Sequence, residues 1–189
     1  MTNLIVIVNG YPQSGKDTAT GFLVEAMRGM GWSCAHFSII NPVRHFLSSL
    51  GISDIEKTPE YRKLMADVMD RVEAHNHEHA LSRIVLRAIE HAFANYPLDI
   101  GPNRSVAFLH VRQIETIQWI KANAPQGAKV VTLIVNRNGA VVEPSNVADA
   151  GVWGMTYDIV IGNHGPLDQL SEACDDVALH LDREGRADR

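Results

Sequence analysis

The sequence predicts an α/β fold in which a parallel sheet is covered by helices on both faces. Apolar, β-branched runs alternate along the chain with segments of helical periodicity, a pattern typical of parallel strands joined by helices. Several of the runs contain almost no polar residue, as strands buried on both faces do. The 189 residues are 46% apolar and 21% charged, which fits one globular domain.

Five strands are expected. The first is an unbroken run of Leu, Ile and Val directly before Asn9-Gly10, and it shows the pattern of a doubly buried strand most clearly. The third and fourth runs are nearly as apolar as the first. The expected strands span residues 4–8, 34–39, 106–111, 129–135 and 158–161.

Helices are expected between these strands. Gly29 and Gly31 end the first helix, Asn41-Pro42 begins the second, and Thr58-Pro59 begins a long helical stretch. Gly165-Pro166 opens the last helix, and the charged tail from Asp182 is expected to fray. The expected helices span about 16–30, 42–51, 59–96 with a break near residue 76, 114–124 and 166–181.

The chain is predicted to form one domain with an insert. The core comprises about 1–40 and 104–183, and the helix-rich block of about 41–103 interrupts the strand–helix alternation. We expect this insert over the carboxyl edge of the sheet, where open α/β sheets bind ligands. The stretch 138–156 is expected to be a loop.

Charge and cysteine content exclude several classes of protein. A formal charge of −5 argues against non-specific nucleic-acid binding, which needs a basic face. Cys34 and Cys174 form no CxxC pair and are expected to be reduced thiols. The apolar run at 4–8 is too short for a membrane helix and lacks a basic leader. We therefore expect a cytoplasmic protein, a monomer or homodimer, that binds neither membrane nor nucleic acid.

The segment from residue 10 to residue 18 carries the strongest functional signal. It reads Gly10-Tyr11-Pro12-Gln13-Ser14-Gly15-Lys16-Asp17-Thr18, a Walker A pattern between a buried strand and a helix. In such a P-loop the glycines let the backbone approach closely, and successive N–H groups cradle the phosphates of a nucleotide such as ATP. A glycine-rich turn without a ligand is the structural alternative. The predicted nucleotide-binding residues are Gly10, Gln13, Ser14, Gly15, Lys16, Asp17, Thr18 and Arg137.

The residue after the lysine departs from the usual pattern. Asp17 stands where a Ser or Thr hydroxyl normally binds Mg²⁺, and Thr18 follows. A carboxylate could bind this hard cation directly or through water. Asp17 could equally serve as an acidic residue that favours the helix dipole. Asp17 is the first candidate ligand for Mg²⁺, and Thr18 is the second.

The segment 13–18 resembles the loop of the P-loop kinases of the nucleoside monophosphate kinase group, in particular phage deoxynucleoside monophosphate kinases and dephospho-CoA kinase. Segments 38–44, 108–115 and 157–163 are similar to parts of these kinases that follow the second strand, form the third strand and form the closing strand. The resemblance implies a three-layer P-loop NTPase fold, ATP and Mg²⁺, and a small phosphorylated acceptor such as a (deoxy)nucleoside monophosphate. The block 53–103 matches least, and the resemblance places acceptor specificity there.

His110 departs from the family pattern. In many of these relatives the third strand ends in an aspartate that assists Mg²⁺ or the acceptor, and a neutral histidine is a poor Mg²⁺ ligand. Three explanations stay open. Asp17 carries the metal role, or Glu115 or a carboxylate of the insert does, or the protein binds nucleotide and turns it over poorly.

Arginines are the candidates for the charge that phosphoryl transfer requires. Arg112 follows the third strand at the ligand edge, and Arg44 follows Asn41-Pro42, so both are predicted to act with Lys16 in catalysis. Arg137 follows the fourth strand and is assigned to the nucleotide. Any one of these could instead be an ordinary surface arginine. The predicted acceptor-binding residues are Arg44, Arg62, Arg71 and Arg112.

Three functions fit these observations. The first is an ATP- and Mg²⁺-dependent kinase, and the second is a nucleotide-binding regulatory protein with little transfer activity, which His110 favours. An ATPase coupled to a macromolecular partner is disfavoured by the acidic charge. The triplet His75-x-His77-x-His79 is interpreted as a polar junction and not as a metal site, because its spacing does not suit one helix face.

Overall fold

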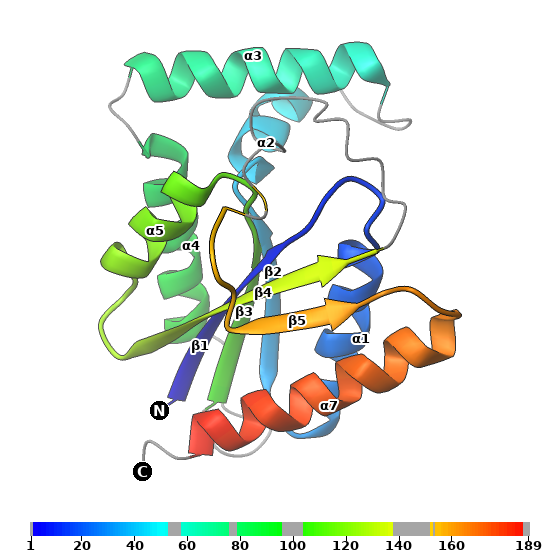
Figure 1. Cartoon of the computed structure of the whole chain (residues 1–189). Helices are drawn as coiled ribbons and strands as arrows, with labels where there is room; N and C mark the ends of the chain where they lie inside the picture. The colour runs from blue at the N-terminus through cyan, green and yellow to red at the C-terminus, as the bar shows by residue number, and fades with distance from the viewer. Residues whose placement is uncertain are drawn as a thin grey trace.

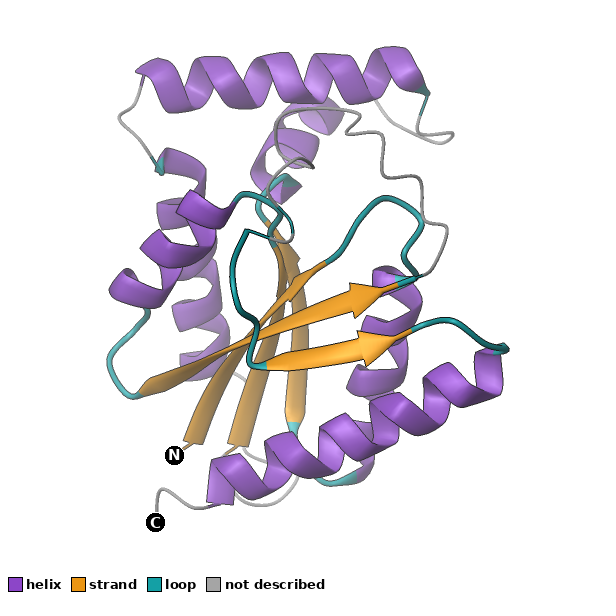
Figure 2. Cartoon of the chain, viewed as in Figure 1, coloured by secondary structure: helices purple, strands orange, loops and turns teal. Residues whose placement is uncertain are grey.

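The computed structural model describes residues 2–52, 58–75, 79–95, 104–137, 152 and 154–186. These form a five-stranded sheet whose pairings are all parallel, in the order β2-β3-β1-β4-β5. The predicted α/β class, with five parallel strands and helices on both faces, is confirmed (Figures 1 and 2). The strands are β1 (Thr2–Asn9), β2 (Ser33–Ser38), β3 (Arg104–His110), β4 (Ala128–Asn136) and β5 (Ile159–Gly162). The helices are α1 (Lys16–Gly29), α2 (Asn41–Ser49), α3 (Pro59–His75), α4 (Ala80–Asn95), α5 (Ile114–Asn123) and α7 (Leu167–Arg186).

Alternate side chains of the strands fill two separate cores. On β1, Leu4, Val6 and Val8 face α1 and α7, whereas Ile5 and Ile7 face the layer made by the remaining helices. This two-residue alternation is the ordinary geometry of a strand, and it explains why β1 carries no polar residue between Leu4 and Val8. The sheet is therefore the middle of three layers.

The strand order places a topological switch point at the carboxyl ends of β1 and β3. These strands are neighbours, yet the chain leaves β1 into α1 on one face and leaves β3 into α5 on the other. Neighbouring strands whose connections leave in opposite directions form the switch point at which open α/β sheets bind ligands. The segment 10–15 and the residues that follow His110 flank this point.

The helical block between β2 and β3 is divided between two places. In Figure 1, α3 crosses above the carboxyl ends of the strands, as expected of an insert. In contrast, α4 buries Leu81, Val85 and Ile89 in the same core as Ile5 and Ile7 of the sheet. Because α4 covers the face of the sheet, it is part of the three-layer core. Glu73 links the two helices, since its carboxylate accepts the N–H groups of Ala80 and Leu81 that begin α4, at 2.8 and 2.9 Å.

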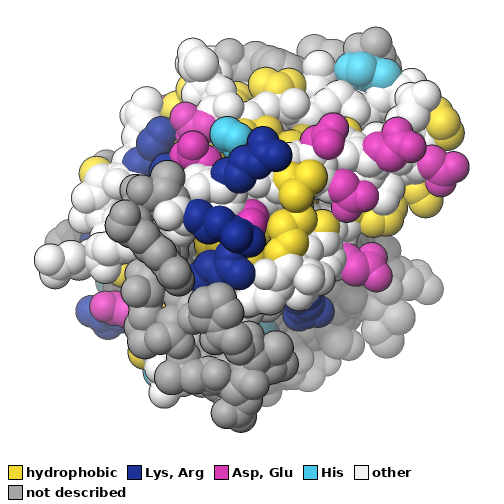
Figure 3. Space-filling model, turned by 90° about the horizontal axis from the view of Figure 1, so that it is seen from below, with side chains coloured by type: hydrophobic (Ala, Val, Ile, Leu, Met, Phe, Trp, Pro, Cys, Tyr) yellow, Lys and Arg dark blue, Asp and Glu magenta, His cyan; other side chains and the backbone are white. Residues whose placement is uncertain are grey.

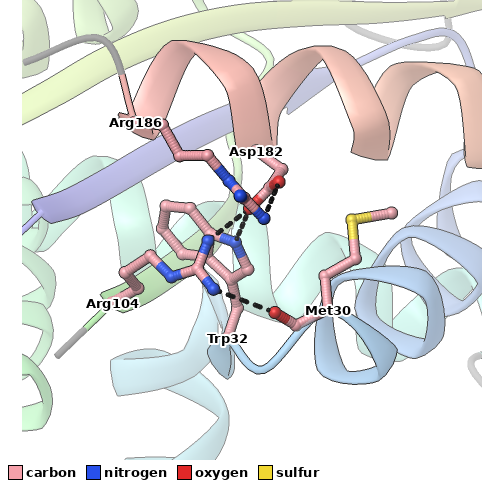
Figure 4. A network of polar contacts seen from close by, with 5 residues as sticks. All are labelled: Met30, Trp32, Arg104, Asp182 and Arg186. Carbon is pink, nitrogen blue, oxygen red and sulfur yellow. Dashed lines mark hydrogen bonds and ion pairs between the residues drawn. The ribbon is translucent and has the colours of Figure 1, made fainter. Parts of the chain in front are cut away.

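The expectation that the tail frays from Asp182 is wrong. Helix α7 continues to Arg186, and Asp182 is buried with 6% of its surface exposed. Figure 4 shows the reason, because its carboxylate receives the indole N–H of Trp32 at 2.9 Å and pairs with Arg104 and Arg186. The Arg104 guanidinium also donates to the Met30 carbonyl at 3.0 Å and lies over the Trp32 ring. The charged residues at this end of the chain are therefore part of the packed structure.

The electrostatics of Asp182 follow from this network. Burial alone would raise the pKa of Asp182, but the hydrogen bonds from Trp32 and Arg186 and the charge of Arg104 outweigh it and hold the pKa below its usual value.

Figure 3, seen from below, shows lysine and arginine side chains gathered on this side of the molecule with acidic side chains beside them. Lys129 also forms an ion pair with a residue of α7, Glu184.

Both cysteines are free and buried, and burial raises the pKa of each thiol to about 11. Within the described ranges, no helix is long and apolar enough to cross a bilayer.

Candidate functional site

Residues 10–16 connect the end of β1 to the first turn of α1, and we call them the phosphate loop after the role that their sequence predicts. Two residues in this loop adopt left-handed backbone angles, Gln13 with φ of 62° and Gly15 with φ of 89°, and Ser14 between them does not. Alternation of this kind turns successive N–H groups towards one side and forms a concave anion site. Gln13 adopts an angle that is costly for a side chain other than glycine, which is a feature typical of functional loops. The loop therefore has the backbone form that its sequence predicts.

Two glycines in the loop cannot be replaced without moving a neighbour. A Cβ at Gly10 would lie 2.7 Å from the Val135 carbonyl oxygen, and one at Gly15 would lie 2.3 Å from the Asn163 amide nitrogen. Both glycines also have positive φ angles. They are required by the close packing of the loop against β4 and the segment after β5.

Asn163, which follows β5, fixes the loop from outside. Its side-chain amide donates to the Ser14 carbonyl at 2.9 Å, and its backbone N–H donates to the Asn136 carbonyl at the end of β4. In a planar peptide the carbonyl and the following N–H point in opposite directions. By holding the Ser14 carbonyl, Asn163 directs the Gly15 N–H to the other side of the peptide. Asn163 lies in the segment 157–163 that resembles the kinase family, but its local sequence predicts no role for it.

We expect Asn163→Ala to weaken ADP binding by roughly 3- to 10-fold, the effect of losing one hydrogen bond that orients the loop. Isothermal titration calorimetry on the folded variant measures this change. Asn123→Ala is the matched control, because the Asn123 amide donates to the Trp119 carbonyl at the end of α5, away from the loop. Equal losses in the two variants would contradict the assigned role of Asn163.

A second asparagine joins the phosphate loop to the exit of β3. The side-chain oxygen of Asn9 accepts the Gly10 N–H at 2.7 Å, and its amide donates to the Arg112 carbonyl and the Tyr157 hydroxyl. Tyr157 in turn donates to the Val152 carbonyl at 2.7 Å. A buried network in which each member has a partner favours one arrangement of its backbone. Asn9 and Tyr157 were not predicted, since the residues of the network are far apart in sequence.

Around the first turn of α1 the structure brings together five polar side chains from three elements. His110, the last residue of β3, has its Nε2 2.9 Å from the Thr20 hydroxyl and its Nδ1 3.3 Å from an Asp17 carboxylate oxygen. The His36 ring of β2 packs edge-on against His110, with centroids 4.4 Å apart. Lys16 is close enough to His110 to influence its titration. Asp17 and Thr18 are exposed, and Thr20 is buried.

The surroundings of both histidines favour the neutral ring. Burial lowers the pKa of His110 to about 4, and the nearby charges of Lys16 and Arg112 act in the same direction, against the opposing effect of Asp17. Partial burial and the charge of Arg44 lower the pKa of His36. Arg44, in the first turn of α2, and Arg112, shortly after β3, thus influence adjacent rings, so the structure places both arginines at the same edge of the sheet.

The remaining arginines and carboxylates are more scattered. Arg62 and Arg71 lie exposed on α3, and Arg137 is exposed directly after β4. Glu115 is exposed in the first turn of α5, and Glu73 is occupied in capping α4.

Among the described residues no group of three or more His, Cys, Asp or Glu could hold a metal ion. The predicted histidine junction lies partly outside the described residues, although His79 itself stacks on Trp119.

The residues fit Mg²⁺ only in part. The exposed Asp17 carboxylate is a suitable ligand for this hard cation, and the Thr18 hydroxyl lies in the same turn. The neutral imidazole of His110, which also faces Asp17, is not a suitable ligand for Mg²⁺. The site as a whole comprises a loop whose backbone form suits an anion, with one lysine and two arginines at the edge of the sheet. The His110 ring nitrogen and the Asp17 carboxylate oxygen lie beside them.

Comparison with known proteins adds little to this geometry. No protein-family model matches the sequence, and no curated protein does. Among solved structures, an unliganded sugar kinase from Janibacter sp. HTCC2649 matches with a TM-score of 0.40 and 14% identity, over 94% of this chain and 93% of that chain. A likeness this weak carries no argument about activity, so the functional conclusions rest on the site.

Proposed function

We propose that this protein is a P-loop phosphotransferase that uses ATP to phosphorylate a small, already phosphorylated acceptor. The phosphate loop carries the proposal. It combines a doubly buried strand, two left-handed residues, a following helix and Lys16, and it lies at the switch point of the sheet. Backbone N–H groups and the helix N-terminus suit the β-phosphate, and Lys16 suits the β/γ-phosphates.

Phosphoryl transfer depends mainly on positioning and on positive charge around the transferred group. Arg44 and Arg112 supply this charge in the proposed reaction and bind the acceptor's phosphate. A divalent cation bound with the nucleotide would neutralise charge on the β- and γ-phosphates. The Asp17 carboxylate is the protein group best suited to hold a hard cation such as Mg²⁺ there.

The acceptor belongs on the side of α3. This helix crosses above the carboxyl ends of the strands in Figure 1, and Arg62 and Arg71 are exposed on it. Arginine binds phosphate through a planar fork of donors, so these residues are candidates to hold an acceptor's phosphate. A (deoxy)nucleoside monophosphate fits this proposal and the family resemblance.

A second candidate function is a nucleotide-binding regulatory protein with negligible transfer activity. His110 favours it, because the strand that ends beside the phosphate loop presents a neutral ring and no carboxylate. Both functions require nucleotide binding. They differ in whether ATP is consumed when an acceptor is supplied.

We expect Lys16→Ala to weaken ADP binding by roughly 10- to 100-fold, since a hydrogen bond to a charged group contributes roughly 1.5 to 3 kcal/mol. Calorimetric titration with ADP tests this, with circular dichroism to confirm that the variant is folded. Lys121→Ala is the matched control, because Lys121 lies in the last turn of α5 and its partner is Asp158. If Lys16→Ala binds ADP as tightly as the wild type does, the phosphate-loop assignment is wrong.

A further inference from the structure

The hydrogen bonds of Thr20 favour one tautomer of His110. The Thr20 hydroxyl donates its only hydrogen to the Lys16 carbonyl at 2.7 Å, because a carbonyl can only accept. With the Thr20 hydroxyl in this orientation, Nε2 is the donor in the 2.9 Å contact between His110 and Thr20. In the neutral ring this leaves Nδ1 without a hydrogen, with its lone pair available.

That lone pair lies opposite another acceptor. His110 Nδ1 is 3.3 Å from the Asp17 carboxylate oxygen, and in this tautomer neither atom carries a hydrogen. Two acceptors that face each other at this distance repel unless a cation or a proton lies between them. Atoms that bind the same ion at roughly 2.1 Å lie roughly 3.0 Å apart at octahedral angles and roughly 3.4 Å apart at tetrahedral angles. The observed distance falls between these values.

We propose that Asp17 Oδ1 and His110 Nδ1 together bind a first-row divalent transition-metal ion in preference to Mg²⁺. An imidazole nitrogen is a good ligand for such ions and a poor one for Mg²⁺. Thr20 supports this role, since histidines that bind metals usually donate their other ring N–H to a fixed acceptor. The departure of His110 from the family pattern is thus a change of metal preference.

The ion needs more than these two side chains. Lys16 and Arg112 are positive neighbours that oppose a cation, and within the described residues no third His, Cys, Asp or Glu joins the pair in a group that could hold a metal ion. The inference therefore rests on the proposed function, in which nucleotide phosphates add negative charge and oxygen ligands at this place. We expect the metal to bind together with the nucleotide and only weakly without it.

Mn²⁺ is the probe of choice, because its unpaired electrons report directly bound nitrogen. ADP affinity is first measured by calorimetry in EDTA, then with Mg²⁺ and with Mn²⁺. We expect Mn²⁺ to tighten ADP binding at least about 10-fold more than Mg²⁺ does, a difference of about 1.4 kcal/mol. Pulsed electron paramagnetic resonance of the Mn²⁺–ADP complex should show coupling to one ¹⁴N nucleus of the protein.

His110→Gln is the test variant. Glutamine keeps an amide N–H for Thr20 and removes the ring nitrogen, so the fold has the best chance of surviving the change. We expect this variant to lose both the ¹⁴N coupling and the preference for Mn²⁺. His36→Ala is the matched control, because it removes the adjacent imidazole and should keep both.

The outcomes separate the two proposals. If the protein binds ADP in EDTA but its Mn²⁺–ADP complex shows no ¹⁴N coupling, the metal assignment is wrong and the assignment of the phosphate loop stands. ¹⁴N coupling that persists in His110→Gln would also overturn the metal assignment. The same conclusion would follow if Asp17 and His110 share a proton that Mn²⁺ does not displace. If the wild-type protein binds no ADP at all, the proposed function fails and the metal inference fails with it.

Discussion

Replacing Arg112 with alanine is expected to lower the rate of phosphoryl transfer by about 10³-fold, because arginines that stabilise the transferred group contribute this much or more. ADP affinity should stay nearly unchanged, since Arg112 lies outside the phosphate loop. The contribution of Arg112 to the packing should survive as well. It is the Arg112 main-chain carbonyl, and not its side chain, that accepts the Asn9 amide hydrogen bond.

Arg44→Ala should behave in the same way, because its charge reaches the same edge of the sheet. Lysine at either position should restore only part of the rate, since it offers a point charge in place of a planar fork. Initial rates of ATP consumption with a panel of nucleoside monophosphates and other small phosphorylated metabolites provide the measurement. Arg28→Ala is the matched control, as Arg28 is exposed in the last turn of α1, at the end of the helix far from the loop.

The regulatory alternative predicts a different outcome. Wild-type protein would bind ADP, consume no ATP with any acceptor in the panel, and be indistinguishable from both arginine variants. That result would replace the phosphotransferase proposal with the regulatory one. A loss of ADP affinity equal to the loss of rate would instead place the arginines on the nucleotide.

Asp182→Ala is expected to lower the free energy of unfolding by about 3 to 5 kcal/mol, because it leaves the buried Arg104 guanidinium without its counter-charge. A loss of this size is a large fraction of the stability of an ordinary domain. Trp32 would lose its hydrogen-bond acceptor in the same variant. Urea unfolding followed by tryptophan fluorescence measures the change. Asp176→Ala, an exposed position on the same helix, is the control and should change stability by less than about 0.5 kcal/mol.

The acid limb of the stability curve provides a further check on Asp182. Its pKa is lower in the folded protein than in the unfolded chain, so the network stabilises the fold at neutral pH. This contribution should disappear as the pH falls below roughly 4 and through the lowered pKa. Asp182→Asn, which cannot ionise, should unfold with a shallower dependence on pH in this range. An unchanged acid slope would show that Asp182 is not the titrating group.

Much of the fold could be predicted because its signals are local. The apolar run of β1, the glycines that end α1 and Asn41-Pro42 at the start of α2 each act through residues close in sequence. The threonine before Pro59 likewise caps α3 through a contact three residues away. Local backbone preferences and side-chain periodicity determine such features, so a single sequence contains them.

The sequence by itself determined that residues 10–16 carry a Walker A pattern and form a loop between a buried strand and a helix, since that pattern is contiguous. Only the tertiary structure decided that Asn163 holds the Ser14 carbonyl, that His110 Nδ1 faces Asp17, and that Asp182 is buried. Each of these contacts joins segments more than 70 residues apart, and each depends on the strand order that brings them together. From sequence alone, a charged residue such as Asp182 is expected to lie in an exposed tail. Its burial can be inferred only when its partners in the fold are known, because a carboxylate is stable in the interior only when it is paired.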